Sequence, residues 1–381
     1  MADDDTPPPT DVVRRTVAAV KRGNQPRGRG TIAPPDEPPR RLMAAGHVLL
    51  VGLICLSIGW ALNAQGVKKT AHGQPIGWRR DVAVFFADPV ASLSSFFQLS
   101  RPREALQSAL GREGDDDINT ALPSPTTPDA GGTTTTIQTA FSPDDPMRVW
   151  IGGDSLAIRS GESMIEDLPP LSGGAIEVVV PQIQQQVATG LARPEVLNWP
   201  EHLRSETERD DPDVVVLTVG INDAQPLTGE GGVGPFGTEE WQAEYRRRVG
   251  GLMDQVLGEG RTLVWVGIPI VRDGGRDAQF QVINEIVRSE AELREGRVLF
   301  VDIYEMFKDH NGNYAEYLAN DAGEIVKYRE PDGIHLTPAG GDRVAAEVFG
   351  TIAENFDLTS WRDDQPSTTA STAPVTTTPP P

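Results

Sequence analysis

The sequence predicts a three-layer α/β/α domain with a mainly parallel, five-stranded sheet, and three observations lead to this fold class. Short apolar, β-branched runs alternate with longer segments of helical periodicity between residues 147 and 358. The short runs are apolar at successive positions, as strands buried between two helix layers require. Glycines and polar residues follow several of these runs, and ligands of parallel sheets bind at the carboxyl ends of the strands.

The elements follow in chain order. The expected strands are residues 148–151, 175–180, 214–219, 263–268 and 298–303. A helix is expected from Thr238, because apolar residues then recur at the three- and four-residue spacing of one buried face: Trp241, Tyr245, Val249, Leu252, Met253, Val256 and Leu257. The last helix should begin after Thr337 as N-cap, with Pro338 in its first turn. Before it, residues 314–331 predict a hairpin around an Asn-Asp-Ala-Gly turn.

An apolar stretch precedes the domain. Residues 42–62 carry no formal charge and, at about 1.5 Å per helical residue, are long enough to cross a bilayer core of roughly 30 Å. A cleaved signal peptide is the alternative, but residues 1–41 would make an unusually long leader. More Lys and Arg residues precede the span than follow it, which places the N-terminus in the cytoplasm. We therefore expect a single-pass cell-membrane protein whose domain is extracytoplasmic.

The remaining segments are read from composition. Residues 1–41 are expected to be a disordered cytoplasmic tail, and residues 63–114 a partly helical juxtamembrane region. Residues 115–146 predict a Thr/Pro-rich linker, and residues 359–381 a disordered Thr/Pro tail. The folded domain then spans residues 147–358.

Charge and cysteine content exclude several function classes. The formal net charge of -21 and the lack of a basic stripe argue against binding to nucleic acid. The single cysteine, Cys55, lies in the apolar stretch, so the sequence predicts neither a disulfide framework nor a cysteine-based metal site. We expect no metal and no cofactor, and the sequence identifies no protein partner.

A serine follows the first expected strand, in Gly152-Gly153-Asp154-Ser155. A serine hydroxyl needs a base to become a good nucleophile, and histidine is the usual one. Of the five histidines, His335 is the best placed, because Asp332 three residues earlier can accept the second imidazole N–H.

Attack on an ester creates an oxyanion that needs preorganised donors. The backbone N–H groups of Ser155 and Gly190 and the side-chain amide of Asn222 are the candidates. Each motif alone is also typical of an ordinary turn or helix cap, and it is their joint order at successive strand ends that favours catalysis.

These motifs resemble a known family. "GGDSLA", the glycine of "ATGLARP", "VGIND" and "DGIHLT" are similar to the four blocks of the SGNH (GDSL) hydrolase superfamily, over more than half the chain. The resemblance implies the flavodoxin-like SGNH fold, with Ser155 as nucleophile, Asp332 and His335 as its partners, and Gly190 and Asn222 in the oxyanion hole. "TGLARPEVLNWP", "VGIPIVRD" and "VKYREPDGIHLTPAG" resemble a bacterial, often membrane-anchored branch of poorly defined role.

Other residues near these motifs have secondary expectations. Asp154 and Asp223 are expected to be structural partners of the loop backbone, not proton carriers. Arg272 and Arg329 are candidates for the substrate rim, with a surface ion pair as the alternative. Residues 224–237 are glycine-rich and predict a mobile rim or lid over the site.

Three functions fit these features. The first is an extracytoplasmic serine esterase that acts through an acyl-Ser155 intermediate on ester substrates, with acetylated envelope polysaccharide as the expected class. The second is an O-acyltransferase to cell-envelope sugars. The third is a non-catalytic SGNH-like protein of envelope binding or assembly, against which the complete residue set argues.

Overall fold

The computed structural model describes residues 45–74, 78–97, 119–126, 140–258 and 260–362. The chain forms two compact units, residues 1–58 and 59–381. The predicted N-terminal tail lies outside the described residues, as do residues 98–114, 127–139 and 363–381 of the predicted juxtamembrane, linker and C-terminal segments.

The predicted α/β fold with a parallel central sheet is confirmed. Five strands follow the order β2-β1-β4-β5-β6, and all neighbours are parallel. Their bounds are β1 Met147–Gly153, β2 Ile176–Val178, β4 Val214–Thr218, β5 Thr262–Val266 and β6 Val298–Val301. A sixth, two-residue strand, β3 (Gln184–Gln185), also pairs with β1 in parallel. Since β3 consists of two glutamines, it lacks the apolar run by which the other strands were predicted.

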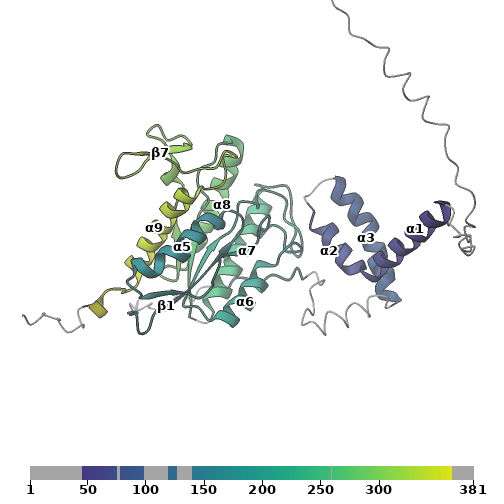
Figure 1. Cartoon of the computed structure of the whole chain (residues 1–381), viewed down its shortest axis with the longest axis horizontal. Coiled ribbons are helices and arrows are strands. Elements are labelled where there is room, and N and C mark those ends of the chain that lie inside the picture. The colour runs from purple at the N-terminus through teal and green to yellow at the C-terminus, as the bar shows by residue number, and fades with distance from the viewer. Residues whose placement is uncertain (1–44, 75–77, 98–118, 127–139, 259, 363–381) are drawn as a thin grey trace, which may run out of the picture. The chain divides into compact units, whose positions relative to one another are not determined.

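Helices cover both faces of this sheet (Figure 1). On one face, α5 (Ala157–Leu171) packs against α9 (Pro338–Asn355). On the other, α7 (Glu239–Leu257) packs between α6 (Trp199–Asp210) and α8 (Gly274–Glu292). The strands between these layers are nearly free of solvent exposure, which makes burial of their apolar side chains the main driving force for the fold.

Two helices begin where the sequence predicts. Thr238 caps α7 by accepting a hydrogen bond at Oγ1 from the Trp241 N–H, at 3.2 Å. Thr337 caps α9 in the same way, from the Gly340 N–H at 3.2 Å. The apolar face predicted for α7 is buried in full, and Arg248 is buried on the same face.

The predicted hairpin is also confirmed. It consists of the antiparallel strands β7 (Tyr317–Ala319) and β8 (Ile325–Lys327), and the chain runs from it directly to Asp332. Two short 3-10 helices complete the domain, η1 (Glu305–Phe307) and η2 (Ser360–Arg362).

Three helices precede the domain in the chain. They are α1 (Ala45–Leu62), α2 (Ala64–His72) and α3 (Trp78–Phe96). Helices α2 and α3 contact each other, and α3 buries Ala87 and Ala91. Judged by length and hydropathy among the described residues, none of these helices spans a membrane alone, whereas α1 and α2 qualify as a pair that is bent by 78°.

Part of the predicted linker lies against the domain. The Asn198 side chain donates from Nδ2 to the carbonyl oxygens of Asn119 and Ala121, at 3.2 and 2.8 Å. Near the end of the linker, the Phe141 N–H donates to the Asp357 carbonyl at 2.9 Å. Composition did not reveal these contacts, because they are made mainly by backbone carbonyl and N–H groups, which every sequence has. We call residues 119–126 the strap.

Candidate active site

Ser155 lies in the turn between β1 and α5, at the carboxyl edge of the sheet. Gly153, the last residue of β1, is paired with Thr218, the last residue of β4, so the two strands end side by side. Ser155 Oγ is 2.9 Å from His335 Nε2, although the two residues are 180 positions apart in sequence. The fold thus joins the serine of the first motif to the histidine of the last.

Asp332 orients the histidine. Its Oδ2 lies 2.6 Å from His335 Nδ1, and its Oδ1 accepts hydrogen bonds from the backbone N–H groups of Ile334 and His335, at 2.8 and 3.0 Å. Partial burial alone would raise the pKa of Asp332, but these hydrogen bonds outweigh burial and lower it to about 2. With Nδ1–H donating to this carboxylate, the lone pair of Nε2 faces Ser155, as a general base requires.

Arg329 is not on the substrate rim, and that expectation is corrected. Its side chain is 0% exposed, and its Nη1 and Nη2 donate to the carbonyl oxygens of Ile270 and Ile334, at 2.5 and 2.6 Å. The guanidinium also lies over the rings of Phe307 and Tyr314. A side chain held this way supports the loop that carries His335 from beneath and cannot reach a ligand.

Arg272 matches the alternative reading, an ion pair. Its Nη2 lies 2.8 Å from Glu316 Oε2, and its Nη1 donates to the Pro331 carbonyl at 2.7 Å. The Arg272 side chain is 46% exposed. It remains at the surface beside the Asp332 loop, and the Arg272 N–H donates to the Gly333 carbonyl within that loop.

Gly190 and Asn222 lie together. Asn222 Nδ2 donates to the Thr189 carbonyl at 2.8 Å, which holds the peptide that contains the Gly190 N–H. A Cβ at Gly190 would lie 2.0 Å from Asp223 Oδ1, so no residue with a side chain fits there. Within the described part of the chain, the N–H groups of Ser155 and Gly190 donate to no protein acceptor. Both are therefore available to an oxyanion.

Asp154 joins the Ser155 turn to the Asn222 turn. Its Oδ1 accepts from the Leu156 N–H at 2.9 Å, and its Oδ2 accepts from the N–H groups of Gly220 and Ile221, at 3.0 and 3.3 Å. The side chain is fully buried, and burial raises the pKa of Asp154 to about 7, against the opposing effect of these hydrogen bonds. This geometry is that of a backbone partner, as the sequence predicts.

Asp223 performs a similar task on the Gly190 side. Its Oδ2 and Oδ1 accept from the N–H groups of Leu191 and Ala192, each at 2.9 Å, and Tyr245 donates its hydroxyl to Oδ2 at 2.8 Å. Burial raises the pKa of Asp223 to about 6, although the same hydrogen bonds oppose the rise.

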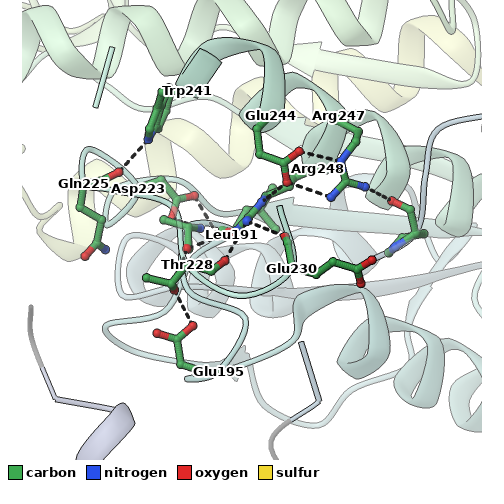
Figure 2. Close-up of polar contacts among 12 residues, drawn as sticks. Leu191, Glu195, Asp223, Gln225, Thr228, Glu230, Trp241, Glu244, Arg247 and Arg248 are labelled. Carbon is green, nitrogen blue, oxygen red and sulfur yellow. Dashed lines mark hydrogen bonds and ion pairs between the residues drawn. The ribbon is translucent and has the colours of Figure 1, made fainter. Parts of the chain in front are cut away.

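The glycine-rich loop, residues 224–237, is anchored rather than free along its length. Figure 2 shows Thr228 and Glu230 of this loop beside Arg248 and Leu191. Thr228 donates from its N–H to the Ala192 carbonyl at 2.9 Å and from Oγ1 to Glu195 Oε2 at 2.5 Å. The prediction of a mobile lid is not supported for this part of the loop, because its backbone hydrogen bonds are satisfied within the domain.

Comparison with known proteins now places the chain. The model of a family described as "Protein of unknown function (DUF459)" matches residues 148–351, which include all of the motifs above. The chain belongs to the DUF459 family. The SGNH superfamily resemblance is confirmed as well, since this DUF459 domain has the α/β fold and joins the serine, asparagine and histidine motifs at one sheet edge.

Similar solved structures include three esterases or hydrolases. A family 3 carbohydrate esterase from Clostridium thermocellum is 18% identical, with 55% of this chain and 96% of that chain covered and a TM-score of 0.36. A catalytic mutant of an acetylxylan esterase from Geobacillus stearothermophilus is 15% identical, with 59% and 98% covered and a TM-score of 0.40. An alpha/beta hydrolase enzyme from the metagenome of Lake Arreo, Spain, is 18% identical, with 54% and 95% covered and a TM-score of 0.39. No curated protein matches the sequence.

Sequence reasoning missed Arg248 and its partner Glu244 on α7. Both lie below the oxyanion segment, and Arg248 is 2% exposed. Helical spacing contains the signal, because Arg248 follows Tyr245 by three positions and precedes Leu252 by four, on the face that is otherwise apolar. Among the described residues, no group of three or more His, Cys, Asp or Glu side chains is placed to hold a metal ion.

Proposed function

We propose that this DUF459 protein is a serine esterase that cleaves small acyl groups from carbohydrate outside the cell membrane. The observation that carries the proposal is the hydrogen-bonded series from Ser155 Oγ through the His335 ring to Asp332, at 2.9 and 2.6 Å. Both distances are within the range of a nucleophile and base ready to react.

The mechanism follows from this geometry. Ser155 Oγ attacks the ester carbonyl while its proton passes to His335 Nε2, and the imidazolium is stabilised by Asp332. The negative charge on the former carbonyl oxygen is met by the N–H groups of Ser155 and Gly190 and by the Asn222 amide. As the C–O bond to the alcohol breaks, His335 gives its proton to the departing oxygen, and the acyl group stays on Ser155.

Water then completes the cycle. It loses a proton to His335 Nε2 as its oxygen attacks the acyl carbon, and collapse of the second tetrahedral intermediate returns that proton to Ser155 Oγ with release of the acid. The side chains of His335 and Asp332 are 38% and 48% exposed, so water reaches them. This exposure favours hydrolysis over transfer to a sugar, and it suits an acyl group attached to a large polymer better than one that must be enclosed.

The location is part of the proposal. Residues 42–62 are proposed to anchor the chain in the cell membrane, with its N-terminus in the cytoplasm and the domain outside, where acylated envelope polysaccharide is the ester within reach. The substrate class thus rests on place, and the reaction type rests on the site.

The test is the Ser155→Ala variant of the full chain, purified in detergent. We expect its hydrolysis of p-nitrophenyl acetate to fall by at least about a thousandfold, since loss of the nucleophile leaves only binding and oxyanion stabilisation. Labelling by a fluorophosphonate probe should disappear. Ser160→Ala is the matched control, because Ser160 lies on α5 with its hydroxyl bonded to the Ala157 carbonyl at 3.3 Å.

The same pair of variants tests the substrate. Wild type and Ser160→Ala, but not Ser155→Ala, should release acetate from acetylated envelope polysaccharide. Labelling or hydrolysis that persists in Ser155→Ala would overturn the assignment of the nucleophile, and release of no acid from any polysaccharide fraction would overturn the substrate class alone.

A further inference from the structure

Arg248 is a buried cation that the mechanism above does not use. It lies on α7 with 2% of its surface exposed. Its Nε donates to Glu244 Oε1 at 2.8 Å, and its two terminal nitrogens donate to four backbone carbonyl oxygens (Figure 2). A charge buried this deeply is destabilising unless its donors are satisfied, and the planar fork of arginine satisfies them in fixed directions.

Two of those carbonyls belong to the oxyanion segment. Arg248 Nη1 donates to the Leu191 carbonyl at 2.8 Å and to the Ala192 carbonyl at 3.2 Å. The N–H groups of the same two residues donate to the Asp223 carboxylate, each at 2.9 Å. A cation therefore holds the carbonyl side of this segment and an anion holds its N–H side, directly after Gly190.

The other two carbonyls belong to the glycine-rich loop. Arg248 Nη2 donates to the carbonyl oxygens of Thr228 and Glu230, at 2.8 and 3.1 Å. One guanidinium thus fixes the loop that follows Asn222 to the segment that follows Gly190. Those are the two parts of the chain that supply oxyanion donors from outside the Ser155 turn.

We propose that Arg248 is a positioning residue of the oxyanion hole. It touches neither substrate nor Ser155, and it acts by fixing where the Gly190 N–H points relative to the Asn222 amide. The proposal rests on the esterase function proposed above. Since the oxyanion forms only on the way to the transition state, loss of this support lowers kcat and leaves ground-state binding nearly unchanged.

The neighbouring Arg247 provides a matched control. It pairs with the same Glu244, at 2.7 Å from Nε to Oε2, but its Nη1 donates to the Pro123 carbonyl of the strap at 3.1 Å, and its side chain is 28% exposed. Arg247 is thus the same residue type on the same helix with the same carboxylate partner, and it has no contact with the oxyanion segment among the described residues.

The experiment compares Arg248→Lys, Arg248→Met, Arg247→Lys and Arg247→Met in the full chain. The kcat and KM for p-nitrophenyl acetate are measured per active site, with sites counted by the end-point of fluorophosphonate labelling and Ser155→Ala as the blank. Counting sites removes any fraction that fails to fold. Arg248→Lys keeps the charge and one donor direction, so it remains informative if Arg248→Met does not fold.

We expect Arg248→Lys to lower kcat by about ten- to a hundredfold, with KM within twofold of wild type, because a whole oxyanion donor is worth about 10²–10³ in kcat. Arg248→Met should lose more, and both Arg247 variants should stay within twofold. A folded Arg248→Lys with unchanged kcat, a loss confined to KM, or an equal loss in the Arg247 variants would overturn the proposal. An inactive wild type would instead overturn the esterase function.

Discussion

At the scale of single residues, two buried carboxyl groups shape the site without taking part in the chemistry. Asp154 and Asp223 are both fully buried and accept hydrogen bonds from the N–H groups of the loops that carry Ser155, Asn222 and Gly190. A carboxylate is the acceptor that can hold several N–H donors at once, and its burial is compensated by those donors.

The raised pKa of Asp154 predicts how stability depends on pH. The pKa rises from 3.8 in the unfolded chain to about 7 in the folded one, so the folded protein holds an extra proton between these values. The stability that this proton contributes is complete below pH 3.8 and is lost as the pH rises through about 7.

Urea unfolding of wild type and Asp154→Asn at several pH values measures this effect. Between pH 5 and pH 8, the free energy of unfolding of wild type should fall by up to about 3 kcal/mol relative to that of Asp154→Asn, which cannot ionise. A difference between the two proteins that stays constant over this pH range would show that Asp154 is ionised throughout.

Arg329 and Arg272 show how burial separates two like residues. Both lie close to the Asp332 loop, yet Arg329 is fully enclosed and bonds backbone carbonyls, whereas Arg272 is half-exposed in an ion pair with Glu316. The sequence presents both as cations near a catalytic motif and contains nothing that distinguishes them.

At the scale of elements, the strap depends on a glycine of α7. A Cβ at Gly251 would lie 2.2 Å from the Pro123 carbonyl oxygen, so the strap backbone approaches this helix where a side chain is missing. The Thr126 N–H at the end of the strap donates to Asp254 Oδ2 at 2.7 Å. The helix therefore gives up helical propensity at Gly251 to make room for an extended segment.

Gly251→Ala tests this arrangement against Gly350→Ala. Gly350 lies in α9 with nothing within 4 Å of an added Cβ, so its replacement should stabilise the protein by about 0.5–1 kcal/mol. Gly251→Ala should instead destabilise it and speed hydrogen exchange in residues 119–126. Equal gains in urea unfolding for both variants, with unchanged exchange in the strap, would contradict the docking.

The elements themselves were largely predictable. The strands with apolar runs, the α7 face and both threonine caps follow from periodicity and from the side chains that accept hydrogen bonds at helix starts. Strand β3 and the strap were not predictable in the same way, because each is held by backbone hydrogen bonds whose partners come from elsewhere in the fold.

At the scale of the whole molecule, the proposed topology can be tested with the single native cysteine. Cys55 lies in α1 and is replaced by serine, after which Ala322→Cys adds one thiol at the exposed turn between β7 and β8. We expect a membrane-impermeant maleimide to label this thiol in intact cells, since the domain is proposed to lie outside.

The matched control is Ala33→Cys in the same background. Its thiol should react only after the membrane is opened, because residues 1–41 are proposed to lie in the cytoplasm. The reverse pattern of labelling would invert the topology, and labelling of both positions in intact cells would show that residues 42–62 do not anchor the chain as proposed.

The sequence by itself determined the fold class and the residues of the candidate site, since both are carried by local patterns: strand and helix periodicity, and four motifs in a fixed order. Ser155, Asp332, His335, Gly190 and Asn222 were all named from those motifs. Only the tertiary structure decided which charges are buried and what they hold. Arg248 reaches residues 191, 192, 228 and 230 at once, and Arg329 reaches residues 270 and 334. Such contacts link backbone groups far apart in the chain, and backbone groups leave no mark in a sequence.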